Sequence, residues 1–155
     1  MSVEESMPDL ESEPPGSVPE VNAPLEDLGV VTHRRIQSGL CGTVTHREAG
    51  AATVLLLTTA QMGADDQGLV HGGFVFGAAD YAAMVAVNDP NVVLGAAETR
   101  FTAPVRVGDS VLCSAQVEGQ KGRKRVVRVV CTVEGTAVME GRFTTFVLDQ
   151  HVLDA

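Results

Sequence analysis

The segment from about Gly72 to Asn88 constrains the fold of this chain more than any other part of the sequence. Its side chains are almost all apolar, and they leave no polar stripe at helical spacing. A helix that is apolar all round must be covered on nearly every side. The pair Asp89 and Pro90 that follows is a typical helix stop. The sequence therefore predicts one buried helix across this segment.

Segments with a β-type pattern lie on both sides of the predicted helix. Two of them precede it as a predicted hairpin, and four more follow it. Their ranges are 38–47, 51–59, 92–101, 110–120, 123–133 and 137–148. Within 110–120, apolar residues such as Val111 and Cys113 alternate with polar ones, which favours an antiparallel sheet with one buried face. This order predicts an α+β fold in which a curved antiparallel sheet wraps around one long apolar helix.

Length and charge narrow the class of protein further. The 155 residues fit one domain, and a hydrophobic share of 45% is enough for a core. No run of 18 or more apolar residues is present, so the sequence predicts no membrane span. The net charge of −9 is concentrated at the start, because residues 1–28 hold eight of the 20 acidic residues and no basic one. From Gly29 onward the charges nearly balance, which argues against a nucleic-acid partner.

The first 24 residues are rich in Pro, Glu and Ser and poor in apolar side chains. Because such a segment cannot bury enough apolar area to offset its ordering entropy, we expect a disordered acidic leader at 1–24 and one domain at 25–155. The leader has no basic start and no apolar stretch, which argues against a secretory signal. Cys41, Cys113 and Cys131 form no CxxC motif, so we expect buried reduced thiols, no metal site and a cytoplasmic location.

One carboxylate, Asp80, interrupts the apolar helix. Burying an ionised carboxylate is costly unless it is paired, so such a residue is either a well-satisfied structural acid or a working one. Nine residues upstream stand His71, Gly72 and Gly73, at the expected helix start. Two glycines let a ligand approach the backbone, and free N–H groups at a helix N-terminus can stabilise an oxyanion. An oxyanion site together with a buried carboxylate is what acyl-transfer chemistry requires.

Three stretches of the chain carry a resemblance to a known family. GLVHGGFVFGAADYAAM, FTAPVRVGDSVLCSAQV and GRKRVVRV resemble the hotdog-fold acyl-CoA thioesterases, and they are closest to the PaaI-like (phenylacetyl-CoA thioesterase-like) branch. That branch has the pattern HGG, six residues, then Asp. The resemblance extends over about residues 36–146, and the order of the strands supports it more than the HGG motif does alone.

The resemblance implies a metal-free acyl-CoA thioesterase that needs no cofactor. Asp80 would act as general base or as nucleophile, and the Gly72 N–H would polarise the thioester carbonyl. His71 and Gly73 would shape the site around the acyl-CoA. In this family the active sites lie between subunits, so the resemblance also implies a homodimer or a dimer of dimers.

Several site residues keep two interpretations. Where many PaaI-like relatives have Asn six residues before the motif His, this chain has Asp65, which either raises the pKa of Asp80 or belongs to an ordinary loop. Glu98 either pairs with Arg100 or orients water. His71 could serve simply as a helix cap. Lys121, Arg123 and Lys124 either bind the phosphates of coenzyme A or form a solvated face.

Two other functions are weighed against hydrolysis. A non-catalytic acyl-CoA binding or sensing module on the same fold is the alternative. Fused DNA-binding helices would favour that module, and the sequence shows none. A hotdog hydratase would want a different His and acid pattern, so the HGG motif argues against it.

Overall fold

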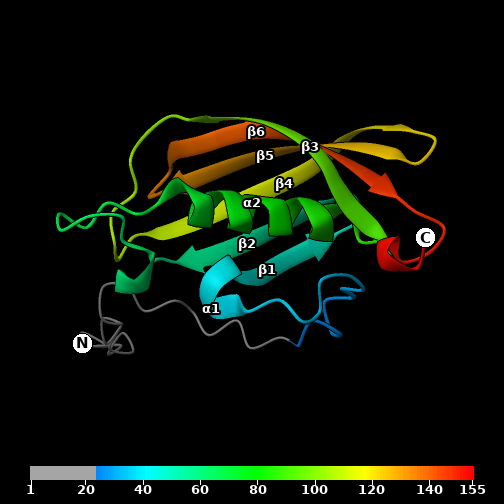
Figure 1. Ribbon diagram of the computed structural model, residues 1–155, viewed down its shortest axis with the longest axis horizontal. Helices are drawn as coiled ribbons and strands as arrows, with labels where there is room; N and C mark the ends of the chain where they lie inside the picture. Colours follow the sequence, from blue (N-terminus) through cyan, green and yellow to red (C-terminus); the bar gives the residue numbers. More distant parts are fainter. Residues whose placement is uncertain (1–23) are drawn as a thin grey trace, which may run out of the picture.

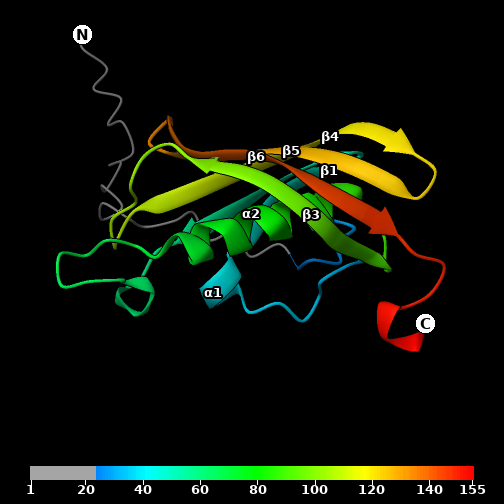
Figure 2. The ribbon, with the colours of Figure 1, turned by 45° about the horizontal axis from the view of Figure 1, so that its top comes forward.

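The computed structural model describes residues 24–155, so all of the predicted leader except Pro24 lies outside the described residues. The chain forms one six-stranded antiparallel sheet in the order β1-β2-β4-β5-β6-β3. The elements are α1 (Ser38–Cys41), β1 (Thr43–Glu48), β2 (Ala51–Leu57), η1 (Ala60–Met62), α2 (Gly72–Val87), β3 (Val92–Phe101), β4 (Ser110–Lys121), β5 (Lys124–Val133), β6 (Thr136–Val147) and η2 (Val152–Asp154). The sheet curves around α2, which lies across its inner face (Figures 1 and 2). The predicted α+β fold class, a curved antiparallel sheet around one helix, is confirmed.

Helix α2 matches the predicted segment almost residue for residue. It begins after His71 and ends before Asn88, whose backbone is left-handed at φ 54°. Asn is among the few residues that adopt this conformation readily at a helix end. The core lies between α2 and the inward side chains of the strands, and nine helix residues are buried in it. The helix packs mainly over β2, β4 and β5 rather than over β6 and β3.

The prediction of a strand from residue 38 is wrong at its start. Ser38–Cys41 form the short helix α1, and β1 begins only at Thr43. Between them Gly42 has φ 94°, and a Cβ there would lie 2.6 Å from Val54 Cγ1. Only glycine fits this close, left-handed turn, which separates the helix from the strand. As a result α1 packs against α2 instead of extending the sheet.

A segment of irregular backbone, residues 24–37, lies ahead of α1, and we call it the N-terminal strap. The side chain of Asn88 holds it with two hydrogen bonds: Oδ1 accepts from the Val31 N–H at 2.9 Å, and Nδ2 donates to the Gly29 carbonyl at 2.9 Å. Val30, between the two bonded residues, is buried in the core. The end of α2 therefore fixes the path by which the chain reaches α1.

The three cysteines are free thiols, and two of them are buried as predicted. Cys113 and Cys131 are cross-strand partners on β4 and β5, with their Sγ atoms 3.0 Å apart. The prediction is wrong for Cys41, which is only half-buried on α1. Within residues 24–155, no helix is both long and apolar enough to cross a membrane. In the same range no group of three or more His, Cys, Asp or Glu is arranged to hold a metal ion.

Candidate active site on helix α2

Asp80 lies near the middle of α2, and one of its carboxylate oxygens is buried without a partner. No described residue donates a hydrogen bond to Oδ1. Burial raises the pKa of the Asp80 carboxyl from 3.8 to about 6. A helix whose neighbouring turns are all apolar has no side chain to offer this oxygen, so the local sequence explains both the shift and the missing bond. At this oxygen Asp80 lacks the partner that a structural acid would have, and a carboxyl with this pKa can take up or release a proton near neutral pH.

Open space adjoins this acid on the same face of α2. Gly77, three residues earlier, would place a Cβ that meets nothing within 4 Å apart from its chain neighbours and the backbone of its own helix. Gly73, Gly77 and Asp80 follow one another at helical spacing, and none of them is fully buried. On the opposite flank α1 brings Cys41 close enough that the Asp80 charge helps burial to raise the pKa of its thiol, burial being the larger cause. One side of the acid is therefore lined by the protein's own chain and the other is open.

The start of α2 presents unused backbone donors. Among the described residues, none accepts a hydrogen bond from the N–H of Gly72 or Gly73, and the first helical bond of this turn runs from the Phe74 N–H to the His71 carbonyl. His71 occupies the N-cap position, yet its side chain makes no capping hydrogen bond. Its own N–H donates to the Met62 carbonyl at 2.9 Å, which fixes the entry of the chain into the helix. Unpaired N–H groups at a helix N-terminus are the kind of donors that can bind an anion.

Two aromatic rings explain why both residues after His71 are glycines. A Cβ on Gly73 would lie 2.8 Å from the His71 Nε2 atom. A Cβ on Gly72 would lie 3.1 Å from Cε1 of Phe101, a residue that is itself 55% exposed. The motif therefore keeps space for these two rings.

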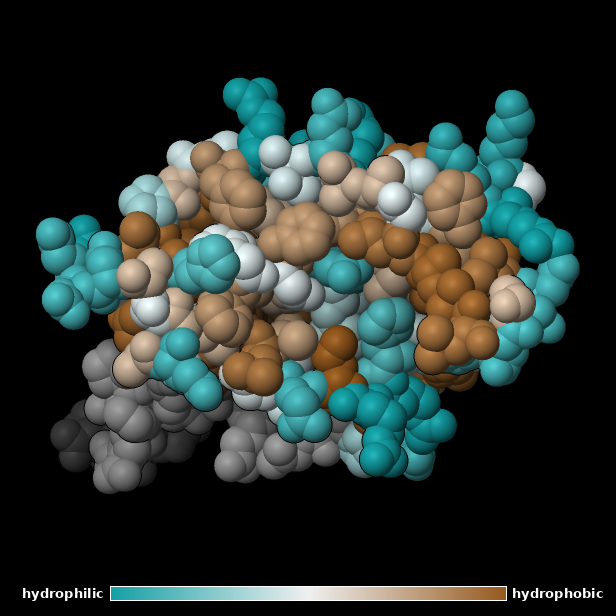
Figure 3. All heavy atoms as spheres, viewed as in Figure 1, coloured by the Kyte–Doolittle hydropathy of each residue, from teal (hydrophilic) through white to brown (hydrophobic). Residues whose placement is uncertain are grey.

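Gly72 also borders an apolar pocket of about 430 Å³ between the start of α2 and the end of β3. Its lining includes Leu69, Val75, Phe101, Pro104 and Val138. Figure 3 shows brown, hydrophobic surface running across the face that carries α2 and β3. Sequence reasoning missed Phe101, although an aromatic residue at the end of a strand with no other aromatic side chain was a visible signal.

The acid and the backbone donors of one chain are too far apart to act on one carbonyl group. Asp80 follows Gly72 by eight residues, which corresponds to about 12 Å along the axis of an α-helix. A reacting carbonyl needs the base or nucleophile and the oxyanion donor each within about 3 Å. Within one chain, therefore, Asp80 and the N–H of Gly72 cannot both reach one carbonyl group.

Asp65 is used by its own loop. Its Oδ1 accepts hydrogen bonds from the Gln67 N–H at 2.9 Å and from the Leu69 N–H at 3.1 Å. Bonds of this kind fix the turn that leads into the His71 region. The geometry matches the loop interpretation of Asp65, and within one chain this carboxylate is already engaged.

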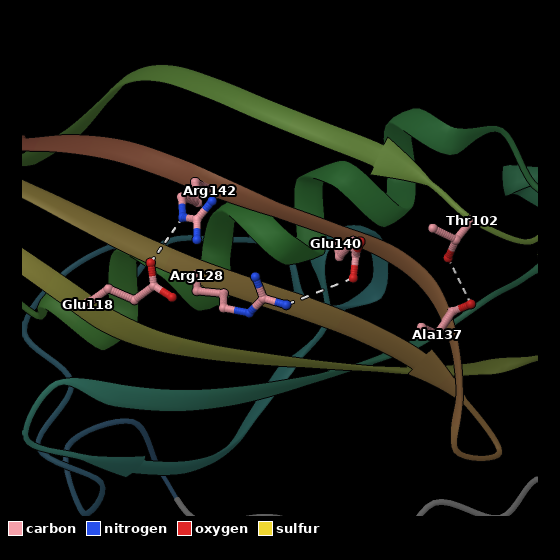
Figure 4. A network of polar contacts seen from close by, with 6 residues as sticks. All are labelled: Thr102, Glu118, Arg128, Ala137, Glu140 and Arg142. Atoms are coloured by element: carbon pink, nitrogen blue, oxygen red, sulfur yellow. Dashed lines mark hydrogen bonds and ion pairs between the residues drawn. The ribbon is translucent and has the colours of Figure 1, made fainter.

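Glu98 is not brought together with Asp80 in one chain. It lies opposite Arg142 on β6, and directly opposite residues of antiparallel strands share a face. Arg142 donates to Glu118 at 3.1 Å, and Arg128 lies 3.9 Å from Glu140, on the side of the sheet that faces away from α2 (Figure 4). Glu98 therefore belongs to this charged outer face, and no ion pair joins it to Arg100 among the described residues.

Lys121, Arg123 and Lys124 lie in the hairpin between β4 and β5, which we call the basic hairpin. Arg123 forms an ion pair with Asp149. In Figures 1 and 2 this hairpin lies at one end of the sheet, while the loop that precedes α2 lies at the other. One chain thus places its predicted phosphate contacts away from its own His71 motif.

Comparisons with known proteins agree with this architecture. The family model described as MaoC like domain matches residues 37–139. An uncharacterized protein from Pyrococcus horikoshii has a similar structure, with a TM-score of 0.79 and 48% identity over 80% of this chain and 95% of that one. The Escherichia coli PaaI protein from the phenylacetic acid degradation operon follows with a TM-score of 0.67 and 26% identity, over 72% and 83% of the two chains.

Curated relatives carry several different names. A methylthioribose-1-phosphate isomerase of Aquifex aeolicus is 49% identical over 79% of this chain, but the chain spans only 27% of that protein. Transcription factor FapR of Caldanaerobacter subterraneus is 25% identical over 88% of this chain and 70% of its own length. An (R)-specific enoyl-CoA hydratase of Rhodospirillum rubrum is 44% identical over 31% of this chain and 35% of its own. These names include a hydratase, the class that the HGG motif argued against.

Proposed function

Since the chain belongs to the MaoC-like domain family of hotdog-fold proteins, we propose that it hydrolyses an acyl-CoA thioester to a free acid and coenzyme A. The observation that carries the proposal is the unpartnered, buried Oδ1 of Asp80 beside open space on α2. A carboxyl whose pKa is raised to about 6 is largely ionised at neutral pH and still basic enough to accept a proton.

The reaction follows from the two parts of the site. Asp80 either takes a proton from water, which then attacks the thioester carbonyl carbon, or attacks that carbon itself and is released by water. In both routes the carbonyl oxygen becomes an oxyanion, and the N–H of Gly72 stabilises it. The C–S bond then breaks. In the base route the leaving thiolate takes the proton that Asp80 accepted from water. In the nucleophile route it leaves as a thiolate and takes a proton from the water that later hydrolyses the acyl–Asp80 anhydride. The His71 ring and Gly73 shape the entrance to this position.

The separation of about 12 Å between donor and acid along one helix makes the working unit a homodimer or a dimer of dimers. Gly72 of one copy then serves Asp80 of another. The apolar pocket beside Gly72 accepts the acyl group, and the basic hairpin contacts the phosphates of coenzyme A. Asp65 acts by holding its loop in place, whereas Glu98 contributes to the outer face.

Two relatives define the competing functions. The FapR similarity favours a module that binds acyl-CoA without hydrolysing it. The hydratase similarity and the family model favour addition of water to an enoyl-CoA. Against hydration stands the site itself: within α2 the one acid is Asp80, and the nearest histidine along the helix is nine residues away at its start.

A panel of acyl-CoA and enoyl-CoA compounds tests the proposal. Released thiol reports hydrolysis, and loss of the enoyl absorbance without released thiol reports hydration. Asp80→Asn should lower kcat on the best substrate by about 10²–10⁴-fold, the usual contribution of general-base help, while the variant stays folded. Asp66→Asn, an exposed loop acid, is the matched control and should keep full activity. A folded Asp80→Asn with wild-type kcat, or a wild type that binds acyl-CoA and hydrolyses none of the panel, would contradict it.

A further inference from the structure

The thiols of Cys113 and Cys131 point at each other inside the core. Their Sγ atoms are 3.0 Å apart, and the Cys131 thiol donates a hydrogen bond to the Cys113 sulfur. A disulfide bond is about 2.05 Å long, so the two atoms lie only about 1 Å beyond bonding distance. We call these two residues the thiol pair.

The backbone holds the thiol pair at a separation that suits a disulfide. Cys113 on β4 and Cys131 on β5 are directly opposite each other in the antiparallel ladder. Directly opposite residues of such a ladder have Cα atoms about 4.5–5.5 Å apart, and a disulfide usually joins Cα atoms about 4.4–6.8 Å apart. Rotation of the two side chains can therefore supply the remaining approach of the sulfur atoms, with little movement of the strands.

The thiol pair lies in a row of buried side chains that crosses the sheet. Val54 on β2 is opposite Cys113, and Met139 on β6 is opposite Cys131. All four residues are fully buried. Val54 cannot form a hydrogen bond, and the thioether of Met139 is only a weak acceptor. Within the described residues, each thiol of the pair therefore has the other as its hydrogen-bond partner.

We propose that the thiol pair is a redox-active site, at which hydrogen peroxide forms a disulfide bond between β4 and β5. The inference goes beyond the proposed hydrolysis and does not depend on it. Neither cysteine belongs to α2, to the His71 motif or to the basic hairpin. The pair is thus a second chemical site in the same domain, placed in the sheet on which α2 packs.

The reaction is balanced with one molecule of hydrogen peroxide. In the first step a thiolate of the pair attacks one oxygen of the peroxide, the O–O bond breaks, and a sulfenic acid and water form. In the second step the other sulfur attacks the sulfenic sulfur, the S–O bond breaks, and a second water leaves with the remaining proton. Two thiols and one peroxide give one disulfide and two waters.

The environment of the thiol pair makes this reaction slow at neutral pH. The hydrogen bond between the two thiols, and then burial and the charge of Cys131, raise the pKa of the Cys113 thiol well above its ordinary value. Because the thiolate is the form that attacks, oxidation should speed up as the pH rises. Burial also shields the disulfide, once formed, from thiol reductants. The site therefore responds to prolonged rather than brief exposure to peroxide.

A disulfide at this position would stabilise the fold. Cys113 and Cys131 are 18 residues apart, and the basic hairpin lies between them. A cross-link that fits the native geometry restricts the unfolded chain and leaves the folded chain nearly unchanged. The oxidised protein should therefore melt about 3–10 °C higher than the reduced one.

Mass spectrometry tests the reaction with peroxide. Cys41 is partly exposed and would react separately, so the experiment uses Cys41→Ala. After prolonged treatment with hydrogen peroxide at mildly alkaline pH, the protein is denatured and its free thiols are alkylated. We expect the mass to fall by two hydrogen atoms, no alkylated thiol, a peptide that joins Cys113 to Cys131, and the higher Tm.

The matched control is the double variant Cys41→Ala, Cys113→Ala, which keeps one thiol of the pair. It should lose no pair of hydrogen atoms and should show no rise in Tm after the same treatment. Two alkylated thiols in the oxidised Cys41→Ala protein, or a sulfinic acid without a cross-link, would overturn the proposal.

A glutathione redox buffer tests the geometry without depending on access to the core. The equilibrium between dithiol and disulfide is measured for Cys41→Ala with and without denaturing urea, after the fractions have stopped changing. A disulfide that stabilises the folded chain is favoured by the folded chain by the same factor, so its equilibrium constant should be at least about tenfold greater without urea. A constant equal to or smaller than that in urea would show that the native sheet resists the bond, and it would overturn the proposal.

Discussion

The imidazole ring of His71 lies over the backbone of Gly73, with Nε2 only 2.8 Å from where a Cβ of residue 73 would stand. The second glycine of the motif is thus the residue that allows the His71 ring its position at the start of α2. Because that ring is exposed, it can swing away at little cost if the space is taken.

Gly73→Ala should therefore lower the activity while changing the stability of the fold very little. The added methyl group displaces the His71 ring, so kcat/KM should fall as far as it does in His71→Ala. The unfolding free energy should change by no more than about 1 kcal/mol, since glycine itself disfavours a helix by a similar amount. Gly39→Ala, where a Cβ meets nothing within 4 Å, is the control and should leave the rate unchanged. Wild-type kcat/KM in Gly73→Ala would show that the ring position does not matter.

The raised pKa of Asp80 predicts a pH-dependent stability. Its carboxyl has a pKa of about 6 in the folded chain and 3.8 ordinarily, so between these values the folded state binds more proton. The carboxyl therefore adds most to the unfolding free energy below pH 4, compared with a variant that lacks it. This contribution is lost as the pH rises through 6. Urea titrations of wild type and Asp80→Asn should show the variant gaining relative stability from pH 4 to pH 7. A constant difference would contradict the shift.

The ionisation of Asp80 should also determine how kcat/KM falls at acidic pH. Protonated Asp80 can neither attack nor accept a proton, so kcat/KM should fall on acidification below about pH 6. The profile is measured on a substrate whose release of thiol is followed at every pH. A rate that is flat down to pH 4.5 would exclude Asp80 as the ionising group.

Subunit complementation checks whether donor and acid come from different copies. Gly72→Pro removes the N–H at the first helical position, where proline is tolerated. This variant and Asp80→Asn should each be inactive as homodimers. Co-expressed, they form heterodimers in which one site carries both defects and the other carries none, so up to about a quarter of wild-type activity should return. No recovery in a mixture shown to contain heterodimers would place both groups in one chain.

Neutralising the basic hairpin should affect binding more than chemistry. Replacing Lys121, Arg123 and Lys124 by Gln should raise KM for acyl-CoA and largely spare kcat. The reason is that contacts to the phosphates stabilise the bound substrate and the transition state equally. The effect should shrink at high salt. Arg35→Gln, an exposed arginine in the N-terminal strap, is the control. An unchanged KM at low ionic strength would show that the basic hairpin is a solvated surface that does not bind the phosphates.

Local pattern was enough to predict most of this fold. The apolar run and its closing Asp89 and Pro90 predicted α2 to within a residue, and β3 was predicted with its observed bounds of 92 and 101. The mistake at 38–41 arose because a short apolar piece fits a strand or a helix equally well, and the left-handed Gly42 that decides between them gives no periodic signal.

The site was less predictable because it depends on contacts between distant segments. Asp80 could be singled out as one acid in an apolar helix. That Glu98 faces away from it depends on the bulge at Gly95, which resets which residues of β3 point inward. The use of Asp65 by its own loop likewise follows from turn geometry rather than from residue type.

Asn88 joins two parts of the chain that are 57 residues apart, because its Oδ1 atom accepts a hydrogen bond from the Val31 N–H. We therefore expect the last turn of α2 and the N-terminal strap to open as one cooperative unit, since neither can leave without breaking the bonds of the same amide. In hydrogen exchange the amide of Val31 would report the fraying of the helix end. Helix α1, which lies beside Asp80, directly follows that strap. The stability of the two Asn88 hydrogen bonds therefore limits how rigidly α1 is held next to the acid.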